Sequence, residues 1–240
     1  QERHMRTILL AAALAAATAL PAAASTILDF DTQNGGAAGV AGNIAGTEYT
    51  DFGVTISVSG GTAQLARFES NCGPSFPGTP CTGGDSDLAS GPAFGTPPQG
   101  LVLIGQDTSL TEPGDLLGSY TFRFDFAPRA FLGTVQMLDL DEGEFDPGAT
   151  NLEFTRVFSD GTSTSDFSPA IPASTLGSGD NSLSTFTFNE ANVTALEIAF
   201  DSISGSVAAV EFTPVPLPAG AVLVLTGLGA FGALRRRKTA

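Results

Sequence analysis

Carboxylates are the main chemical groups that this chain offers. The densest acidic group lies at residues 139–146, where five acids surround Gly143, and a second group follows the Gly83-Gly84 pair. Calcium prefers oxygen ligands, and glycine lets a loop fold back so that its carbonyls point at an ion. The spacing misses the EF-hand pattern, because no Glu closes the loop at its twelfth position. The calcium candidates are Asp139, Asp141 and Glu144 first, then Asp85 and Asp87. Solvated acidic loops are the alternative explanation, as they are for Asp29 with Asp31.

The residue types that most hydrolases use are missing from the middle of the chain. The single His is His4 and the single Lys is Lys238, so Ser-His-Asp hydrolysis, lysine Schiff bases and histidine-ligated zinc have no candidates between them. Glycoside hydrolysis needs only two carboxylates, but nothing selects a pair among the acids, and the chain has no Trp to stack on a sugar ring. We therefore expect a protein that is not an enzyme, with a secreted carbohydrate-active enzyme as the alternative.

Alternating apolar and polar residues dominate residues 25–213. The clearest example is residues 120–126, where Tyr120, Phe122, Phe124 and Phe126 alternate with polar side chains and so predict a half-buried strand. The run 101–104 is continuously apolar and predicts a strand covered on both faces. Other predicted strands are 26–30, 54–58, 63–68, 131–140, 152–158, 185–188, 195–200 and 207–212. Their number and spacing favour an all-β domain, a two-sheet antiparallel sandwich of jelly-roll type.

The same stretch is strongly acidic. Twenty-four of the 25 acids fall within it, against the four arginines Arg67, Arg123, Arg129 and Arg156, which leaves it at a net charge of −20. Such a surface repels phosphate backbones and anionic lipid headgroups. The charge therefore argues against nucleic-acid binding and against peripheral membrane binding by this domain.

The beginning of the chain has the pattern of a secretory signal peptide, residues 5–24. Arg6 supplies the positive charge, residues 8–20 are almost unbroken apolar, and Ala22-Ala23-Ala24 fits the rule for small residues at a cleavage site. Cleavage after Ala24 by signal peptidase would leave Ser25 as the first residue. An uncleaved anchor is the alternative. Residues 1–4 precede the signal and are left out of the interpretation of the fold.

The other end of the chain, residues 214–240, carries a proline motif, an apolar run and a cluster of cations. About sixteen apolar residues from Ala219 would give a helix of roughly 24 Å, which predicts a thin membrane span with the cations on the cytoplasmic side. This helix is the one contact with a membrane that we expect. The motif comprises Val215, Pro216, Leu217, Pro218 and Ala219, and the cluster comprises Arg235, Arg236 and Arg237 with Lys238.

These three parts in this order resemble the PEP-CTERM class of sorting signals, and are most similar to its VPLPA variant. The resemblance implies a Gram-negative bacterium in which an exosortase cuts near the motif. The protein would be anchored transiently in the inner membrane and then passed to the cell surface or the medium. It also implies association with exopolysaccharide or biofilm matrix, so polysaccharide is an expected partner. A simple tail-anchored periplasmic domain is the alternative.

Two cysteines, Cys72 and Cys81, enclose a loop rich in glycine and proline. In an exported chain with only these two cysteines, a structural disulfide is the natural interpretation. A redox or metal role would need a CxxC spacing or a histidine partner, and the sequence has neither.

Overall fold

The computed structural model describes residues 24–84, 86–107, 114, 118–140, 152–167, 181–203 and 205–215. Ser25–Pro214 form one compact unit, and residues 1–24 and 215–240 are assigned to a second unit. The predicted signal peptide and the predicted sorting signal therefore lie almost entirely outside the described residues. Within the described ranges, no helix has the length and apolar character needed to cross a membrane.

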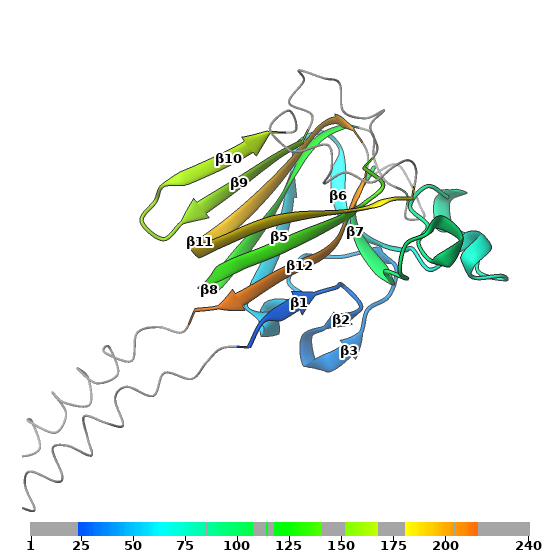
Figure 1. Ribbon diagram of the computed structural model, residues 1–240, viewed down its shortest axis with the longest axis horizontal. Helices are drawn as coiled ribbons and strands as arrows, with labels where there is room; N and C mark the ends of the chain where they lie inside the picture. The colour runs from blue at the N-terminus through cyan, green and yellow to red at the C-terminus, as the bar shows by residue number, and fades with distance from the viewer. Residues whose placement is uncertain are drawn as a thin grey trace, which may run out of the picture. The chain divides into compact units, whose positions relative to one another are not determined.

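The described chain is mostly antiparallel β-sheet, which confirms the predicted all-β class (Figure 1). One large sheet holds ten strands, and β2 and β3 pair separately. The helices of the described residues are single 3₁₀ turns: η1 (Asn34–Gly36), η2 (Thr50–Phe52), η3 (Gly73–Ser75), η4 (Thr82–Gly84) and η5 (Pro92–Phe94). The strands are β1 (Thr26–Leu28), β2 (Thr32–Gln33), β3 (Ala37–Ala38), β4 (Gly42–Asn43), β5 (Val54–Ser59), β6 (Ala63–Glu69), β7 (Leu101–Asp107), β8 (Gly118–Leu138), β9 (Leu152–Phe158), β10 (Ser163–Phe167), β11 (Leu183–Ile203) and β12 (Ser206–Pro214).

Two strands of 21 residues, β8 and β11, organise the large sheet. The first half of β8 pairs with β5 on one side and with the second half of β11 on the other, and that half of β11 continues to β9 and β10. The second half of β8 pairs instead with the first half of β11 and with β12. From β12 the pairing continues to β1, and through β7 to β6 and β4. The two long strands thus take part in two different sets of partners.

The sequence predicted each of these long strands as two separate ones. The register between β8 and β11 shifts around residues 187–195, and β8 passes through Pro128 at the same level. Proline has no N–H to donate, so the ladder is interrupted there although the chain stays extended. The predicted gaps at 127–130 and 189–194 correspond to this bend rather than to loops. The edge strand β10 was not predicted, because Ser163-Thr164-Ser165-Asp166 offers no apolar alternation.

Both halves of the long strands bury side chains in one hydrophobic cluster. Phe122 and Phe124 from the first half of β8 belong to it together with Leu132 and Met137 from the second half. The predicted inward face of residues 120–126 is confirmed, since the ring of Tyr120 is buried and stacks on Phe200 at 4.7 Å between centroids. A second cluster lies on the other face of β6 and β7, where Phe68, Val102 and Ile104 pack against Leu88 and Ala89. The loop that carries the two cysteines covers this face.

A buried arginine holds the β9–β10 hairpin to β11. The Arg156 side chain is 2% exposed, and its Nε and Nη2 donate to both carboxylate oxygens of Glu190 at 3.1 and 3.2 Å. The same Nη2 is 3.0 Å from Asp166 Oδ2 on β10, and Nη1 donates to the Phe154 carbonyl at 2.8 Å. The guanidinium also lies 4.9 Å from the centre of the Phe188 ring. Every partner of this charge is thus supplied by β9, β10 or β11.

Arg156 and Arg123 can be compared to test how much burial adds to the stability that an ion pair contributes. Arg123, 39% exposed, also has two acidic partners, Asp125 and Glu197. Arg156→Ala leaves Glu190 without its bidentate partner, so we expect a loss of about 2–3 kcal/mol of unfolding free energy. Arg123→Ala should cost less than about 1 kcal/mol, because water screens an exposed pair. Urea unfolding of both variants with the disulfide intact measures the difference, and equal losses would contradict a structural role for the buried pair.

Candidate functional site

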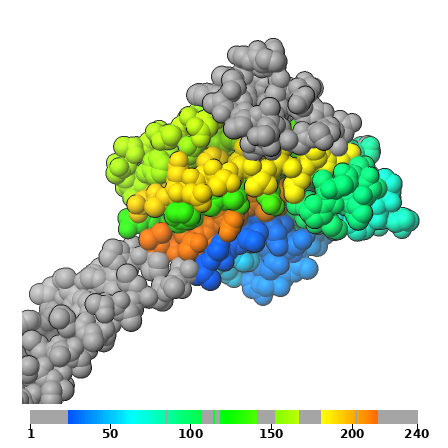
Figure 2. Space-filling view, in the orientation of Figure 1, coloured from blue at the N-terminus to red at the C-terminus, as the bar shows by residue number. Residues whose placement is uncertain are grey.

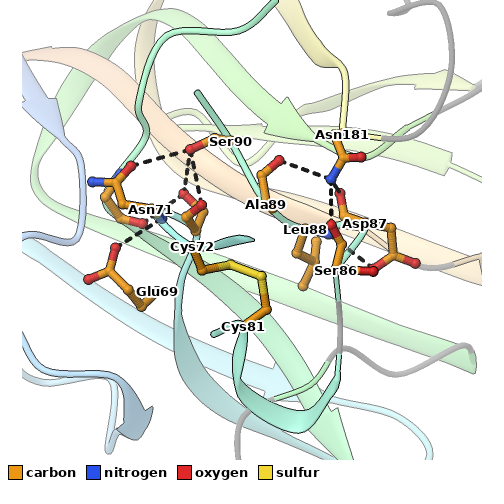
Figure 3. The surroundings of a disulfide bond; sticks show 12 residues. Glu69, Asn71, Cys72, Cys81, Ser86, Asp87, Leu88, Ala89, Ser90 and Asn181 are labelled. Atoms are coloured by element: carbon orange, nitrogen blue, oxygen red, sulfur yellow. Dashed lines mark hydrogen bonds between the residues drawn. A yellow bond between two sulfur atoms is a disulfide. The ribbon is translucent and has the colours of Figure 1, made fainter. Parts of the chain in front are cut away.

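The two cysteines are bonded, as predicted. Cys72 and Cys81 form a disulfide with 5.0 Å between their Cα atoms, and the described residues contain no free cysteine. Cys72 is completely buried in the second cluster, beside Ala89 and Leu88 (Figure 3). The bond therefore secures the long segment between β6 and β7 against the outer face of those strands. Its surroundings are structural and show no second thiol or histidine that would suggest redox chemistry.

A buried hydroxyl network continues from the disulfide to the start of β7. The Ser70 and Ser90 hydroxyls lie 2.9 Å apart, and Ser70 Oγ donates to the Gly100 carbonyl at 2.8 Å. Asn71 Oδ1 accepts from the Gly100 amide at 3.2 Å. These contacts satisfy backbone groups that an irregular segment would otherwise bury without partners.

The structure brings two of the predicted metal ligands into one neighbourhood through a residue that the sequence did not single out, Asn181. Its backbone N–H donates to Asp139 Oδ1 at 3.0 Å. Its side-chain amide donates to the carbonyls of Ser86 at 2.7 Å and Ala89 at 3.0 Å, and also to that of Asp87 (Figure 3). The end of β8 and the segment at residues 86–89 are thereby joined. Residues 177–181, Gly-Ser-Gly-Asp-Asn, are rich in turn-forming residue types, which indicates a loop but no contact.

The described carboxylates in this neighbourhood already have partners. Asp139 is buried with a backbone φ of 67°, and Asp87 Oδ1 accepts the Leu88 amide at 3.0 Å. The described residues contain no group of three or more His, Cys, Asp or Glu side chains placed to hold a metal ion. The other three candidates, Asp85, Asp141 and Glu144, lie outside the described residues. The side-chain amide of Asn181 has two N–H hydrogens, whereas three carbonyl oxygens converge on it. Acceptors therefore outnumber donors at this point.

The third acidic group, Asp29 with Asp31, lies where the first strand meets β7. Asp31 Oδ1 accepts the Leu101 amide at 2.8 Å. Gly100 sits directly against this carboxylate: a Cβ there would fall 2.3 Å from Asp31 Oδ2, and its φ of +67° also favours glycine. Burial raises the pKa of the Asp31 carboxyl, the Leu101 hydrogen bond lowers it in part, and repulsion from Asp29 raises it further. Asp31 therefore serves as a backbone clamp whose carboxyl is harder to ionise than that of a free Asp.

The outer face of the second half of the sheet carries a groove of about 180 Å³. Figure 2 shows this region with β11 in yellow, β8 in green, β12 in orange and β1 in blue as successive bands, the order that the pairing gives. Phe131, 37% exposed, is one of three large apolar side chains exposed in the described part of the chain. The groove is lined by Ser25, Phe131, Gly133, Thr134, Asn189 and Glu211, among others.

Hydroxyl groups hold the carboxylate of the groove in place. Glu211 Oε1 accepts from Ser25 Oγ at 2.9 Å, and Oε2 accepts from Thr134 Oγ1 at 3.0 Å. Gly133 leaves the space beside them open, since a Cβ there would lie 3.3 Å from the Glu211 carbonyl oxygen. No alternation or motif marked these residues, because they come together only when β1, β12 and β8 pair.

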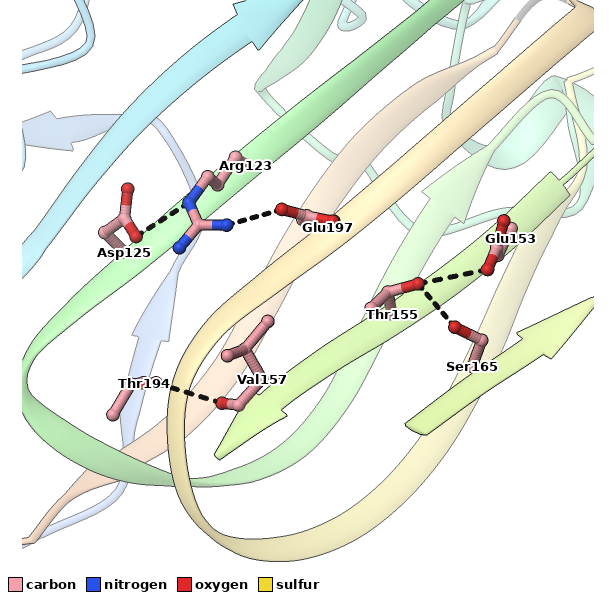
Figure 4. A network of polar contacts seen from close by, with 8 residues as sticks. All are labelled: Arg123, Asp125, Glu153, Thr155, Val157, Ser165, Thr194 and Glu197. Atoms are coloured by element: carbon pink, nitrogen blue, oxygen red, sulfur yellow. Dashed lines mark hydrogen bonds and ion pairs between the residues drawn. The ribbon is translucent and has the colours of Figure 1, made fainter. Parts of the chain in front are cut away.

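The outer face of the other half of the sheet carries a network of polar side chains. Arg123 lies between Asp125 and Glu197, and the Thr155 hydroxyl lies between Glu153 and Ser165 (Figure 4). These acids form ion pairs or hydrogen bonds with neighbouring side chains of the same face.

Comparisons with known proteins add no family to this description. A scan against models of protein families gives no match to the chain, and a search among curated proteins gives none either.

The pKa of Asp31 predicts an effect of pH on stability. A carboxyl whose pKa is raised by folding stabilises the fold when protonated, and this contribution is lost as the pH rises through its folded pKa. Asp31→Asn keeps an oxygen for the Leu101 amide and removes the charge. We therefore expect a higher melting temperature than the parent near neutral pH, with the difference vanishing below about pH 4.

Asp160 provides a control, because folding shifts the pKa of its carboxyl in the opposite direction. Its pKa is lowered by hydrogen bonds from the Thr162 hydroxyl and amide, at 2.7 and 2.9 Å. Asp160→Asn should lower the melting temperature near neutral pH, and this loss should disappear as the pH falls through the folded pKa. Thermal melts of both variants over the acidic range test the pair. A stability gain for Asp31→Asn that does not change with pH would refute the electrostatic explanation.

Proposed function

We propose that this protein is an exported, non-catalytic module of the cell surface or extracellular matrix that associates with exopolysaccharide. The observation that carries the proposal is the disulfide between Cys72 and Cys81, in which Cys72 is buried in the second hydrophobic cluster and Cys81 packs against it. Disulfides of this kind persist in oxidising compartments and are rare in the cytosol. The bonded pair thus supports export independently of the N-terminal signal pattern.

The finer architecture that we propose is a two-sheet sandwich of jelly-roll type. Its support is the exchange of partners by β8 and β11, which divides the large sheet into two sets of strands with a common hydrophobic cluster. A sheet of ten strands buries apolar faces well when it folds over on itself. The crossover from β7 to β12 within the sheet order fits the long connections of such folds.

Processing at both ends belongs to the same proposal. Signal peptidase would cut after Ala24, and an exosortase would cut near the Val215-Pro216-Leu217-Pro218-Ala219 motif, after the apolar helix and the arginines have held the chain in the inner membrane. Val215 directly follows β12, the last strand of the compact unit. A cut at the motif would therefore release the unit with all its strands.

The intact mass of the protein from its native host tests this processing. We expect a species that begins near Ser25 and lacks the Arg235–Lys238 cluster. The double change Pro216→Ala and Pro218→Ala should leave membrane insertion unchanged and block the second cut, because it alters the motif and not the apolar helix. The matched control, Pro214→Ala, alters a neighbouring proline outside the motif. Mature protein that retains Lys238 would show an ordinary anchor and overturn the sorting proposal.

Calcium is a further part of the proposal. A net charge of −20 over residues 25–213 favours any cation that binds only the folded state. Asp139 and Asp87, with Asp141, Glu144 and Asp85, remain the candidate ligands. Support comes from the three carbonyls that meet at Asn181 beside Asp139, since backbone carbonyls are common calcium ligands.

Thermal melts at matched ionic strength separate a calcium site from a diffuse counterion cloud. Calcium should raise the melting temperature well beyond magnesium, because magnesium demands stricter geometry and gives up its water reluctantly. Asp141→Asn should abolish the difference, whereas Asp125→Asn, on the polar face around Arg123, should preserve it. Equal effects of the two cations in the parent protein would exclude a selective site.

A further inference from the structure

The groove between β1, β12, β8 and β11 combines one exposed aromatic ring with neutral polar groups. Phe131 forms its apolar part, while Ser25, Thr134 and Thr213 supply hydroxyls and Asn189 an amide. Asn189 adopts a φ of 56° where the β11 register shifts, so an irregularity of the strand rather than regular pleating places it there. An irregularity of this kind next to a cavity is a common way to re-aim a side chain toward a ligand.

The charge of the groove selects against most ligand classes. Its described lining side chains include a carboxylate, Glu211, and no Lys, Arg or His. An anion such as a phosphate, a nucleotide or an acidic sugar would meet this carboxylate in an acidic domain, and no described side chain of the groove would offer it a cation in return. A purely apolar ligand would remove the hydroxyls of the groove from water without replacing their hydrogen bonds. The remaining class is a neutral ligand with one apolar face and several hydroxyls.

We propose that this groove binds one neutral pyranose unit of a polysaccharide. The C–H face of the sugar lies on Phe131, and its hydroxyls donate to Glu211 and exchange hydrogen bonds with Thr134 and Asn189. The volume of about 180 Å³ suits a single ring rather than an oligosaccharide, so tight binding to a polymer requires many copies along it. The inference rests on the proposed association with exopolysaccharide and adds its site and its chemical class.

Pre-organisation of the carboxylate supports this assignment. Both oxygens of Glu211 are oriented by hydroxyls from separate parts of the chain, Ser25 just before β1 and Thr134 on β8, at 2.9 and 3.0 Å, and each retains acceptor capacity toward the groove. Gly133 keeps the floor clear next to it. A carboxylate held in this way loses little conformational entropy when a sugar hydroxyl donates to it.

Affinity electrophoresis of the full chain in gels containing polysaccharide tests the proposal. The probes are neutral dextran, laminarin and glucomannan, acidic alginate, and exopolysaccharide from the producing strain. We expect retardation by at least one neutral polymer and none by alginate. Phe131→Ala should weaken the retardation about tenfold, as loss of a central aromatic contact does, whereas Phe131→Tyr should preserve it. Glu211→Gln should weaken it without producing retardation by alginate.

Matched controls separate loss of the groove from loss of the fold. Val40→Ala removes an apolar side chain that is 70% exposed and does not line the groove. Glu153→Gln alters a carboxylate that accepts a threonine hydroxyl, as Glu211 does, on the other half of the sheet. Both should bind as the parent does. Thermal melts confirm that each variant is folded, and Phe131→Tyr supplies the readout for position 131 if the alanine variant does not fold.

Four outcomes would overturn the inference, and they differ in what they say about the wider proposal. Retardation by exopolysaccharide that Phe131→Ala and Glu211→Gln leave unchanged would place binding elsewhere and leave the proposed function intact. Retardation by alginate alone would also place binding outside the groove and leave the proposed function intact. Sedimentation that shows a dimer dissociated by Phe131→Ala would assign the groove to a second copy of the chain. Absence of retardation by every polymer would overturn the proposed association as well as this site.

Discussion

Backbone hydrogen bonding along β8 and β11 must continue through a change of partners, because each strand takes part in two sets of pairings. An unpaired N–H or C=O in a buried strand costs about 1–3 kcal/mol. The two strands therefore have to bend at positions where a backbone hydrogen bond is already missing. Pro128 provides such a point on β8, and the register shifts near Asn189 and Asn192 provide it on β11, where both asparagines have positive φ. The common core, the Arg156 contacts and the Asn189 side of the groove all follow from where this bend lies.

The arginines show how an acidic chain builds a stable interior with few cations. Arg156 is buried among two carboxylates and an aromatic ring, whereas Arg123 joins two acids on the surface. Arg67 is also buried, and among the described residues its Nη1 donates to a neutral acceptor, Gln33 Oε1, at 3.2 Å. Burial raises the pKa of the adjacent Tyr49 to about 12, although the Arg67 guanidinium opposes this shift. The phenol therefore stays neutral beside Arg67.

Local pattern predicted much of this fold but little of the candidate site. The alternation from Tyr120 to Phe126 and the apolar run from Leu101 to Ile104 identified strands whose burial depends only on neighbours in sequence. The two cysteines could be paired because the sequence offered no other thiol. The role of Asn181 could not be found in this way, since the partners of its side-chain amide lie more than 90 residues away along the chain and accept through backbone carbonyls that any residue has. The groove was missed for the same reason: Ser25, Thr134 and Glu211 become neighbours only through strand pairing.

The distribution of charge also bears on how such a domain can recognise anything. Its described acids mostly accept hydrogen bonds from nearby hydroxyls and amides, and the net charge of −20 over residues 25–213 keeps the surface repulsive to other anions. Long-range attraction therefore cannot steer an acidic polymer toward it, and specific contacts have to be short-range and made through neutral groups or through bound cations. Among the described residues, the groove at Phe131 is where an exposed ring, several hydroxyls and open volume occur together. A domain of this charge is thus better suited to neutral sugars at that groove than to charged ligands on its faces.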